Sequence, residues 1–237
     1  MKKLHREILP LLMIALMFAI SVYAEPLLKA NEKEEIPIHF ISGKDSVLWV
    51  PRTSAAYLLP IVTLIIYIGL SVIPKIEVYK ENLEEFKQQF LGFKILLVFV
   101  MCAIHVAALL PSLGYWKNVD LVLIVVISVA ILFFYVGYML NFTKRNYFIG
   151  VRTPWTLADE RIWEKTNRLA AKLFWICGVL ALVGLVVQGD ARLWLLIFPA
   201  IVTAIIASAY SLYQYLKTKE RHKSKKQEQN KRLTLTF

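Results

Sequence analysis

Six apolar stretches dominate this chain of 237 residues, and each is long enough to cross a membrane as a helix. The hydrocarbon core of a bilayer is about 30 Å thick, and about 20 helical residues are needed to cross it. The stretches are residues 8–23, 55–73, 90–110, 119–140, 169–187 and 193–213. They predict an all-α integral membrane protein, a bundle of about six transmembrane helices with no room for a large soluble domain.

The chain is basic as well as apolar. Charged residues make up only 19% of it, the mean hydropathy is +0.56 and the net charge is +11. This composition excludes a disordered chain, which needs low hydrophobicity. A basic charge often indicates nucleic-acid binding, but in a membrane protein Lys and Arg gather on the cytoplasmic side. We therefore expect no direct contact with nucleic acid.

The distribution of Lys and Arg predicts the orientation. Twenty of them lie in the N-terminal segment, the second and fourth loops and the C-terminal tail, against six in the other loops. Because positively charged segments stay in the cytoplasm, both termini are predicted to be cytoplasmic. The chain then divides into an N-terminal two-span unit (1–89) with an extracellular loop (25–54), a four-span unit (90–216) with a cytoplasmic loop (141–168), and a basic cytoplasmic tail (217–237).

The first apolar stretch admits a second interpretation. Three basic residues precede it, and residues 22–24 (Val-Tyr-Ala) resemble a signal-peptidase site. Cleavage after Ala24 would leave five spans without changing the orientation of the others, so the charge count does not decide between the two. We expect an uncleaved span.

Few residues within the spans are suited to chemistry. Cys102 and His105 lie on one helix face, but one Cys and one His do not complete a tetrahedral metal site. We therefore expect no metal and no cofactor, and a neutral His105 that is hydrogen-bonded to a neighbouring helix. Lys94 lies about one turn into its span and is expected to snorkel to the inner surface.

Two other function classes are disfavoured. The sequence contains no Walker A loop, no Rossmann glycine motif, no HExxH and no GxSxG, so no enzyme is expected. No span carries Asp or Glu deep in its middle, whereas an ion-coupled transporter usually needs one. A small-molecule or peptide transporter or exporter of the cytoplasmic membrane is the alternative function. In the sixth span, Ala200, Ala204 and Ser208 predict a helix-packing face.

The most unusual stretch is the fourth loop, where residues 146–157 read Asn-Tyr-Phe-Ile-Gly-Val-Arg-Thr-Pro-Trp-Thr-Leu. Gly150 permits a tight backbone, and Pro154 forces Thr153 out of the helical region. A loop with so many specialised residues more often binds a ligand or partner than serves as a plain connection.

A helix is predicted to follow this loop. Thr156 is expected to cap it, and it is expected to continue through Trp163 and Arg168 into the fifth span. Trp155 and Trp163 are predicted to lie in the membrane interface, with basic residues toward the headgroups. Glu164 and Arg168 are four residues apart and are expected to form an ion pair.

The same residues closely resemble the signature of the SdpI family. The string 146–157 carries the resemblance, together with Trp163-Glu-Lys-Thr166 and Arg168. SdpI proteins are bacterial membrane proteins named for immunity to a secreted peptide toxin. Upstream, residues 36–40 (Ile-Pro-Ile-His-Phe) resemble the I-P-x-H-F string of a domain of unknown function that often precedes this signature.

The resemblance implies two linked functions. One is protection of the cell against a membrane-active toxin, and the other is retention of a cytoplasmic transcriptional repressor at the membrane. The expected partners are an extracellular peptide toxin, a cytoplasmic repressor and anionic lipids. Two single positions depart from the family pattern: Tyr138, where Asn is usual, and Asn167, where His is usual. If that His is functional in the family, its function is lost or changed in this chain. After Phe40, residues 41–45 (Ile-Ser-Gly-Lys-Asp) are a shortened form of the string that is usual there.

Two segments hold the candidate binding residues. The extracellular loop is the only outer segment large enough to form a surface for the toxin. In the inner loop, Pro154 and Trp155 are expected to hold Arg152 at the interface, where its planar guanidinium suits a carboxylate or a phosphate. The candidate ligand- or partner-binding residues are Pro37, His39, Phe40, Asn146, Gly150, Arg152, Thr153, Pro154, Trp155, Trp163 and Arg168.

Overall fold

A computed structural model describes residues 2–30, 35–38, 48–110, 113–115, 121–187, 189 and 191–234. Within them, six helices are long and apolar enough to cross a membrane, which confirms the predicted bundle. They are α1 (Lys2–Ala30), α2 (Arg52–Ile76), α4 (Lys87–Leu109), α5 (Leu121–Leu140), α7 (Glu160–Val183) and α8 (Ala191–Thr234). The shorter elements are α3 (Lys80–Glu85), α6 (Pro154–Ala158) and two strands, β1 (Glu35–Ile38) and β2 (Leu48–Pro51).

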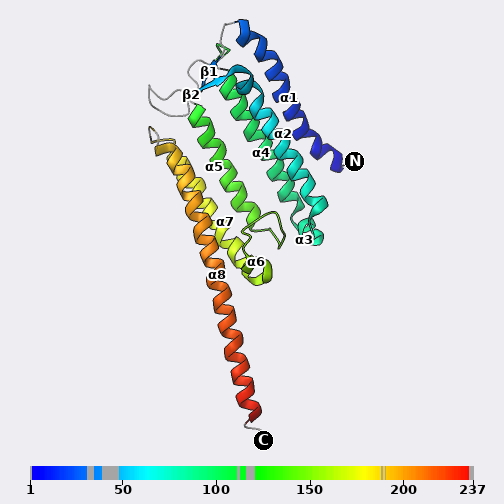
Figure 1. The fold of residues 1–237 in the computed structure, drawn as a ribbon, viewed down its shortest axis with the longest axis vertical. Coiled ribbons are helices and arrows are strands. Elements are labelled where there is room, and N and C mark those ends of the chain that lie inside the picture. The colour runs from blue at the N-terminus through cyan, green and yellow to red at the C-terminus, as the bar shows by residue number, and fades with distance from the viewer. Residues whose placement is uncertain are drawn as a thin grey trace.

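The spanning helices form two groups of three. α1, α2 and α4 pack on one another, α5, α7 and α8 form the second group, and α4 contacts α5 to join the groups. Figure 1 shows both termini, α3 and α6 toward one end of the bundle, and the two strands toward the other. An even number of crossings requires the two termini to share a side, so the arrangement agrees with the predicted topology. The positive-inside count makes that side the cytoplasmic one.

The two strands form an antiparallel hairpin at the opposite end. Pro37 pairs with Trp49 in its register, so this candidate residue lies in a short strand. His39 and Phe40 lie outside the described residues. α1 continues through Pro26 to Ala30, so the connection to α2 is shorter than the predicted 25–54 loop.

Hydrogen bonds made by the Ser21 side chain join the first three spanning helices, α1, α2 and α4. The Oγ of Ser21 lies 3.2 Å from Nε2 of His105 and donates to the carbonyl oxygen of Ala56 at 2.6 Å. Ser21 and His105 are both completely buried. The expected bond between His105 and a neighbouring helix is therefore confirmed, and its partner is α1.

Lys94 does not snorkel to the surface, contrary to the prediction. Only 4% of its side chain is exposed, and its Nζ lies 2.9 Å from a carboxylate oxygen of Glu7. Lys94 also donates to Ser71 Oγ at 3.0 Å, and the Tyr67 hydroxyl donates to Glu7 at 2.8 Å. The physical reason is that α1 covers this face of α4 and brings an acid to the buried ammonium group.

We expect removal of the Glu7 carboxylate to destabilise the bundle. Glu7→Gln leaves the buried ammonium of Lys94 without its counter-charge and should lower the free energy of unfolding by about 2 kcal/mol, less than for a fully buried pair because Glu7 is partly exposed. The double variant Glu7→Gln/Lys94→Met should be no less stable than Lys94→Met alone. Unfolding of the detergent-purified protein, followed by circular dichroism, measures both effects.

A matched control is Glu84→Gln, which breaks the ion pair between two exposed side chains, Glu84 and Lys87. Such a pair contributes about 0.5 kcal/mol. Equal costs for Glu7→Gln and Glu84→Gln would contradict a structural role for the buried pair.

α8 continues far beyond the bundle as a single helix, which Figure 1 shows in orange and red. Its final stretch, residues 217–234, extends about 27 Å at 1.5 Å per residue. Electrostatic attraction to a charged membrane decays over about 8 Å at physiological salt. In an upright helix, only the first basic residues of the tail are therefore close enough to interact with anionic lipid.

Candidate functional site

The segment between α5 and α7 folds back over the first turns of α7 and buries Trp163. The side chain of Trp163 is 1% exposed, and its Nε1 donates to the carbonyl oxygen of Thr143 at 2.9 Å. The predicted interfacial position of Trp163 is therefore wrong, because the loop covers the indole before lipid can reach it. Trp155 is half-buried.

Asn146 organises the start of this loop. Its Oδ1 accepts hydrogen bonds from the backbone N–H groups of Phe148 (2.9 Å) and Ile149 (2.6 Å). Its Nδ2 donates to the carbonyl oxygens of Lys144 (2.8 Å) and Ile149 (2.9 Å). Both ends of this fully buried amide are therefore used to fix the backbone, as expected of an Asn in an irregular turn.

Gly150 and Asn167 fit closely together. Gly150 has φ of +114°, and a Cβ added there would lie 2.6 Å from Oδ1 of Asn167. That oxygen accepts from the backbone N–H of Val151 at 2.8 Å, and Asn167 Nδ2 donates to the Trp163 carbonyl at 3.0 Å. Asn167, one of the two departures from the family pattern, thus holds the loop against α7. The other departure, Tyr138, lies on the outside of α5 and is 42% exposed.

The helix cap is at Thr153, three residues before the predicted one. Thr153 and Thr156 form a reciprocal capping box, and Pro154 opens the five-residue α6. Asp159 then caps α7, accepting from the N–H groups of Arg161 and Ile162. Thr156 was mistaken for the cap because it stands at the third helical position, where its side chain bonds back to the backbone N–H of Thr153 at 2.8 Å. The predicted helix through Trp163 and Arg168 into the fifth span is present as α7, but the prediction that it runs unbroken from Thr156 is wrong, because the extended Asp159 separates α6 from α7.

Glu77, which the sequence did not single out, connects this loop to the first helix group. It follows α2 directly and is only 1% exposed. Its Oε1 accepts from the backbone N–H of Tyr79 at 2.9 Å, and its Oε2 accepts from that of Tyr147 at 3.0 Å. Asn82 adds a second link, donating to the carbonyl oxygen of Arg145 at 2.7 Å. We call these contacts the Glu77 clamp.

Aromatic rings cover the clamp. Tyr79 and Tyr147 stack with ring centroids 5.3 Å apart, and the guanidinium of Arg145 lies 5.1 Å from the centroid of Tyr79. The neighbouring Tyr79 hydroxyl, with a smaller effect from the Glu77 carboxylate, raises the pKa of Tyr147 above its ordinary value. Tyr147 is therefore neutral at physiological pH, and its ring stacks as an uncharged surface.

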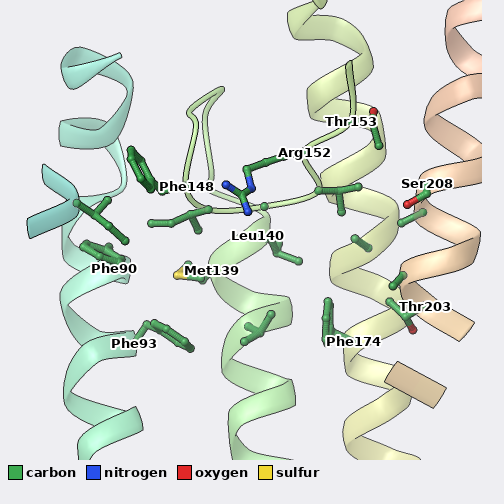
Figure 2. A pocket seen from close by; sticks show the side chains of 18 of the residues that line it. Phe90, Phe93, Met139, Leu140, Phe148, Arg152, Thr153, Phe174, Thr203 and Ser208 are labelled. Atoms are coloured by element: carbon green, nitrogen blue, oxygen red, sulfur yellow. The ribbon is translucent and has the colours of Figure 1, made fainter. Parts of the chain in front are cut away.

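A cavity of about 480 Å³ lies beneath the loop, between the two helix groups. Figure 2 shows Phe90 and Phe93 of α4 on one side, Met139 and Leu140 of α5 in the centre, and Phe174, Thr203 and Ser208 toward α7 and α8. α2 adds Leu70 and Ile73 to the wall. The lining is therefore mostly aromatic and aliphatic, with polar groups from the loop and from α8, as in sites for amphipathic ligands.

Arg152 reaches from the loop toward this cavity, and its guanidinium lies among the lining side chains in Figure 2. The guanidinium donates to the carbonyl oxygen of Tyr147. None of the ion pairs found among the described residues involves Arg152. By contrast, Arg168 pairs with Glu164 at 2.6 Å on the exposed surface, which confirms the predicted pair.

The predicted site residues fall into separate places. Gly150, Arg152 and Thr153 line the cavity, whereas Asn146 and Trp163 are buried supports of the loop. Pro154 and Arg168 are exposed near the same end of the bundle. Pro37 lies at the opposite end, in the hairpin (Figure 1).

The small residues of α8 also divide between two roles. Ala207 is completely buried, and Ser211 Oγ lies 3.0 Å from Thr153 Oγ1, so these residues face the bundle. Ala204 and Ser208, predicted to be part of a packing face, are instead exposed and line the cavity. The packing face is therefore displaced by one residue from the predicted row, to Thr203, Ala207 and Ser211.

Comparison with known proteins confirms the resemblance to the SdpI family. Residues 143–211 match the model of the SdpI/YfhL protein family. The chain is 28% identical over 214 residues to the immunity protein SdpI of Bacillus subtilis (strain 168), covering 90% of this chain and 98% of that protein. With the six apolar helices, this likeness describes a multi-pass bacterial membrane protein. No solved structure matches significantly. The family match begins after residues 36–40, so the upstream domain stays a prediction.

Proposed function

This chain carries the SdpI/YfhL family region at residues 143–211, and from that premise we propose that it is a membrane immunity protein that protects its cell against a secreted antimicrobial peptide. The likeness to the immunity protein SdpI over 90% of the chain is the observation that supports the proposal most directly. The six spans place the chain in the membrane that such a peptide attacks.

The proposal has a second part, the retention of a cytoplasmic repressor at the membrane. The surface available for such a partner is the part of α8 beyond the bundle, which carries Lys217, Lys219, Arg221 and Lys223. Such a surface favours an acidic partner. Reporter expression from a repressor-controlled promoter, with and without residues 217–237, tests this part separately from protection.

A survival assay tests the immunity function. A sensitive strain is made to express the full chain and is then exposed to culture fluid from Bacillus subtilis cells that secrete the peptide toxin. We expect higher survival than in cells with an empty vector. Equal survival, at a protein level in the membrane confirmed by immunoblotting, would contradict the proposal.

Arg152 is the residue most expected to affect protection. Arg152→Ala should reduce protection about tenfold or more, because a charge-assisted bond from a guanidinium is lost. Arg152→Lys should recover only part of it if the ligand is a carboxylate bound by both guanidinium nitrogens. Arg161→Ala, which removes an exposed charge at the same end of the bundle, is the control and should leave survival unchanged. Full protection by Arg152→Ala would exclude Arg152 from the function.

A further inference from the structure

The cavity beneath the loop combines two properties that are found together in amphiphile sites. Its depth is lined by Phe90, Phe93 and Phe174, and its loop side carries the Arg152 guanidinium. An apolar interior with one fixed cation at its mouth is complementary to a molecule with an apolar tail and an anionic head.

The cavity also lies at the depth of the membrane where such a molecule is found. The loop that covers it connects two spanning helices, so Arg152 lies at an end of the bundle where headgroups are located. On α8, Ala204 and Ser208 are exposed at the point where they line the cavity. The cavity is therefore accessible from the side along α8, the direction from which a lipid tail enters.

We propose that this cavity binds one anionic phospholipid of the membrane, with an acyl chain between the two helix groups and the phosphate at Arg152. The guanidinium supplies two or more N–H donors toward the phosphate oxygens while it retains its bond to the Tyr147 carbonyl. Zwitterionic lipids carry a compensating positive charge and are therefore bound less tightly. This site goes beyond the immunity function, because it requires neither the toxin nor a repressor.

The Glu77 clamp is the structural feature that keeps the site formed. Glu77 holds the backbone N–H of Tyr147, and the carbonyl oxygen of Tyr147 accepts from Arg152. One peptide segment thus connects the end of α2 to the cation at the cavity mouth. A lipid bound in the cavity would contact both helix groups, because α2 and α4 line one side and α5, α7 and α8 the other.

Native mass spectrometry of the full chain in detergent measures the bound lipid directly. Phosphatidylglycerol and phosphatidylcholine with the same acyl chains are titrated separately. We expect one tightly retained phosphatidylglycerol, with a dissociation constant about tenfold or more below that of phosphatidylcholine. Arg152→Gln should abolish this preference for the anionic lipid.

Two variants that add the same volume distinguish the cavity from general lipid adhesion. Ala204→Leu fills the cavity, and Ala209→Leu makes the same change on an exposed face of α8 that does not line it. Retention should fall about tenfold for Ala204→Leu and stay unchanged for Ala209→Leu. Equal retention by the two variants, or equal binding of the two lipids, would overturn the proposal.

A competition experiment with millimolar inorganic phosphate completes the test. It lacks an acyl chain and should not displace the bound phosphatidylglycerol. If phosphate alone displaced it, the site would bind a free anion, and the phospholipid proposal would be wrong. Because the measurement uses no toxin, failure of the lipid site and failure of the immunity function can be distinguished.

Discussion

Gly150→Ala is expected to lower the free energy of unfolding by about 3 kcal/mol or more, and to disrupt the loop that carries Arg152. Two independent costs add at this position. The backbone φ of +114° is strained for any L side chain, and the new methyl group would lie 2.6 Å from Asn167 Oδ1. Moving Asn167 away also breaks its bond to the Val151 N–H. Thermal unfolding in detergent gives the stability, and hydrogen exchange at residues 147–153 reports on the loop.

Substitutions at two other glycines allow the backbone cost and the steric cost to be measured separately. Gly114 has φ of +87°, and a methyl group added there would meet no described atom within 4 Å. Gly69 lies in α2 with neither a positive φ nor such a neighbour. Gly114→Ala should therefore show the backbone cost alone, and Gly69→Ala should be neutral or slightly stabilising. If Gly150→Ala were no more damaging than Gly114→Ala, close packing against Asn167 would not contribute.

Hydropathy predicted the spans well because lipid imposes a length requirement that does not depend on tertiary contacts. The fifth span illustrates the limit. Its apolar stretch starts at residue 169, whereas its helix, which was predicted to start at Thr156, begins at Glu160 after the Asp159 cap. Charged residues in its first turns are compatible with a helix that starts outside the hydrocarbon core.

The errors within the spans have a common cause, which is that the partner residues are distant in sequence. Lys94 was predicted to snorkel because it lies about one turn into its span, but the acid that pairs with it in the bundle is Glu7, 87 positions earlier. Trp163 was placed in the interface because an aromatic residue near a span end usually lies there. The loop that buries it is organised by Asn146 and Gly150, whose effect on Trp163 no local pattern reveals.

The cavity could not be predicted from the sequence either, because its walls come from five spanning helices, α2, α4, α5, α7 and α8, and from the loop. One signal was available in the small residues of α8. Small side chains in a membrane helix usually indicate close packing, and Ala207 follows that rule. Ala204 and Ser208 are neighbours on the same helix, yet their small size leaves space for a ligand instead.

Glu77 differs from the acids that follow it in a way that only the structure reveals. Glu81, Glu84 and Glu85 lie within the next eight positions, so the sequence gives no reason to prefer Glu77. Of these four acids, Glu77 is nevertheless the buried one. It accepts hydrogen bonds from the backbone N–H of Tyr79, which follows α2, and from that of Tyr147, in the loop between α5 and α7. Its role is therefore to position the loop and the cation at the cavity mouth.

Glu77→Ala is the second substitution for which we expect a large effect, a decrease of about 3 kcal/mol in the free energy of unfolding. The reason is that two charge-assisted hydrogen bonds are lost and two backbone N–H groups lose their acceptor. Glu77→Gln should recover only part of the loss, because one of its two terminal groups is a donor facing a donor. Glu85→Ala is the matched control, since Glu85 pairs at 3.5 Å with Lys144 of the same loop but both side chains are exposed. Its expected cost is at most about 0.5 kcal/mol. Faster hydrogen exchange at the Tyr147 amide in Glu77→Ala, and not in Glu85→Ala, would locate the effect at the clamp. Identical exchange in the two variants would contradict it, because the Glu77 carboxylate is the acceptor that the structure assigns to that amide.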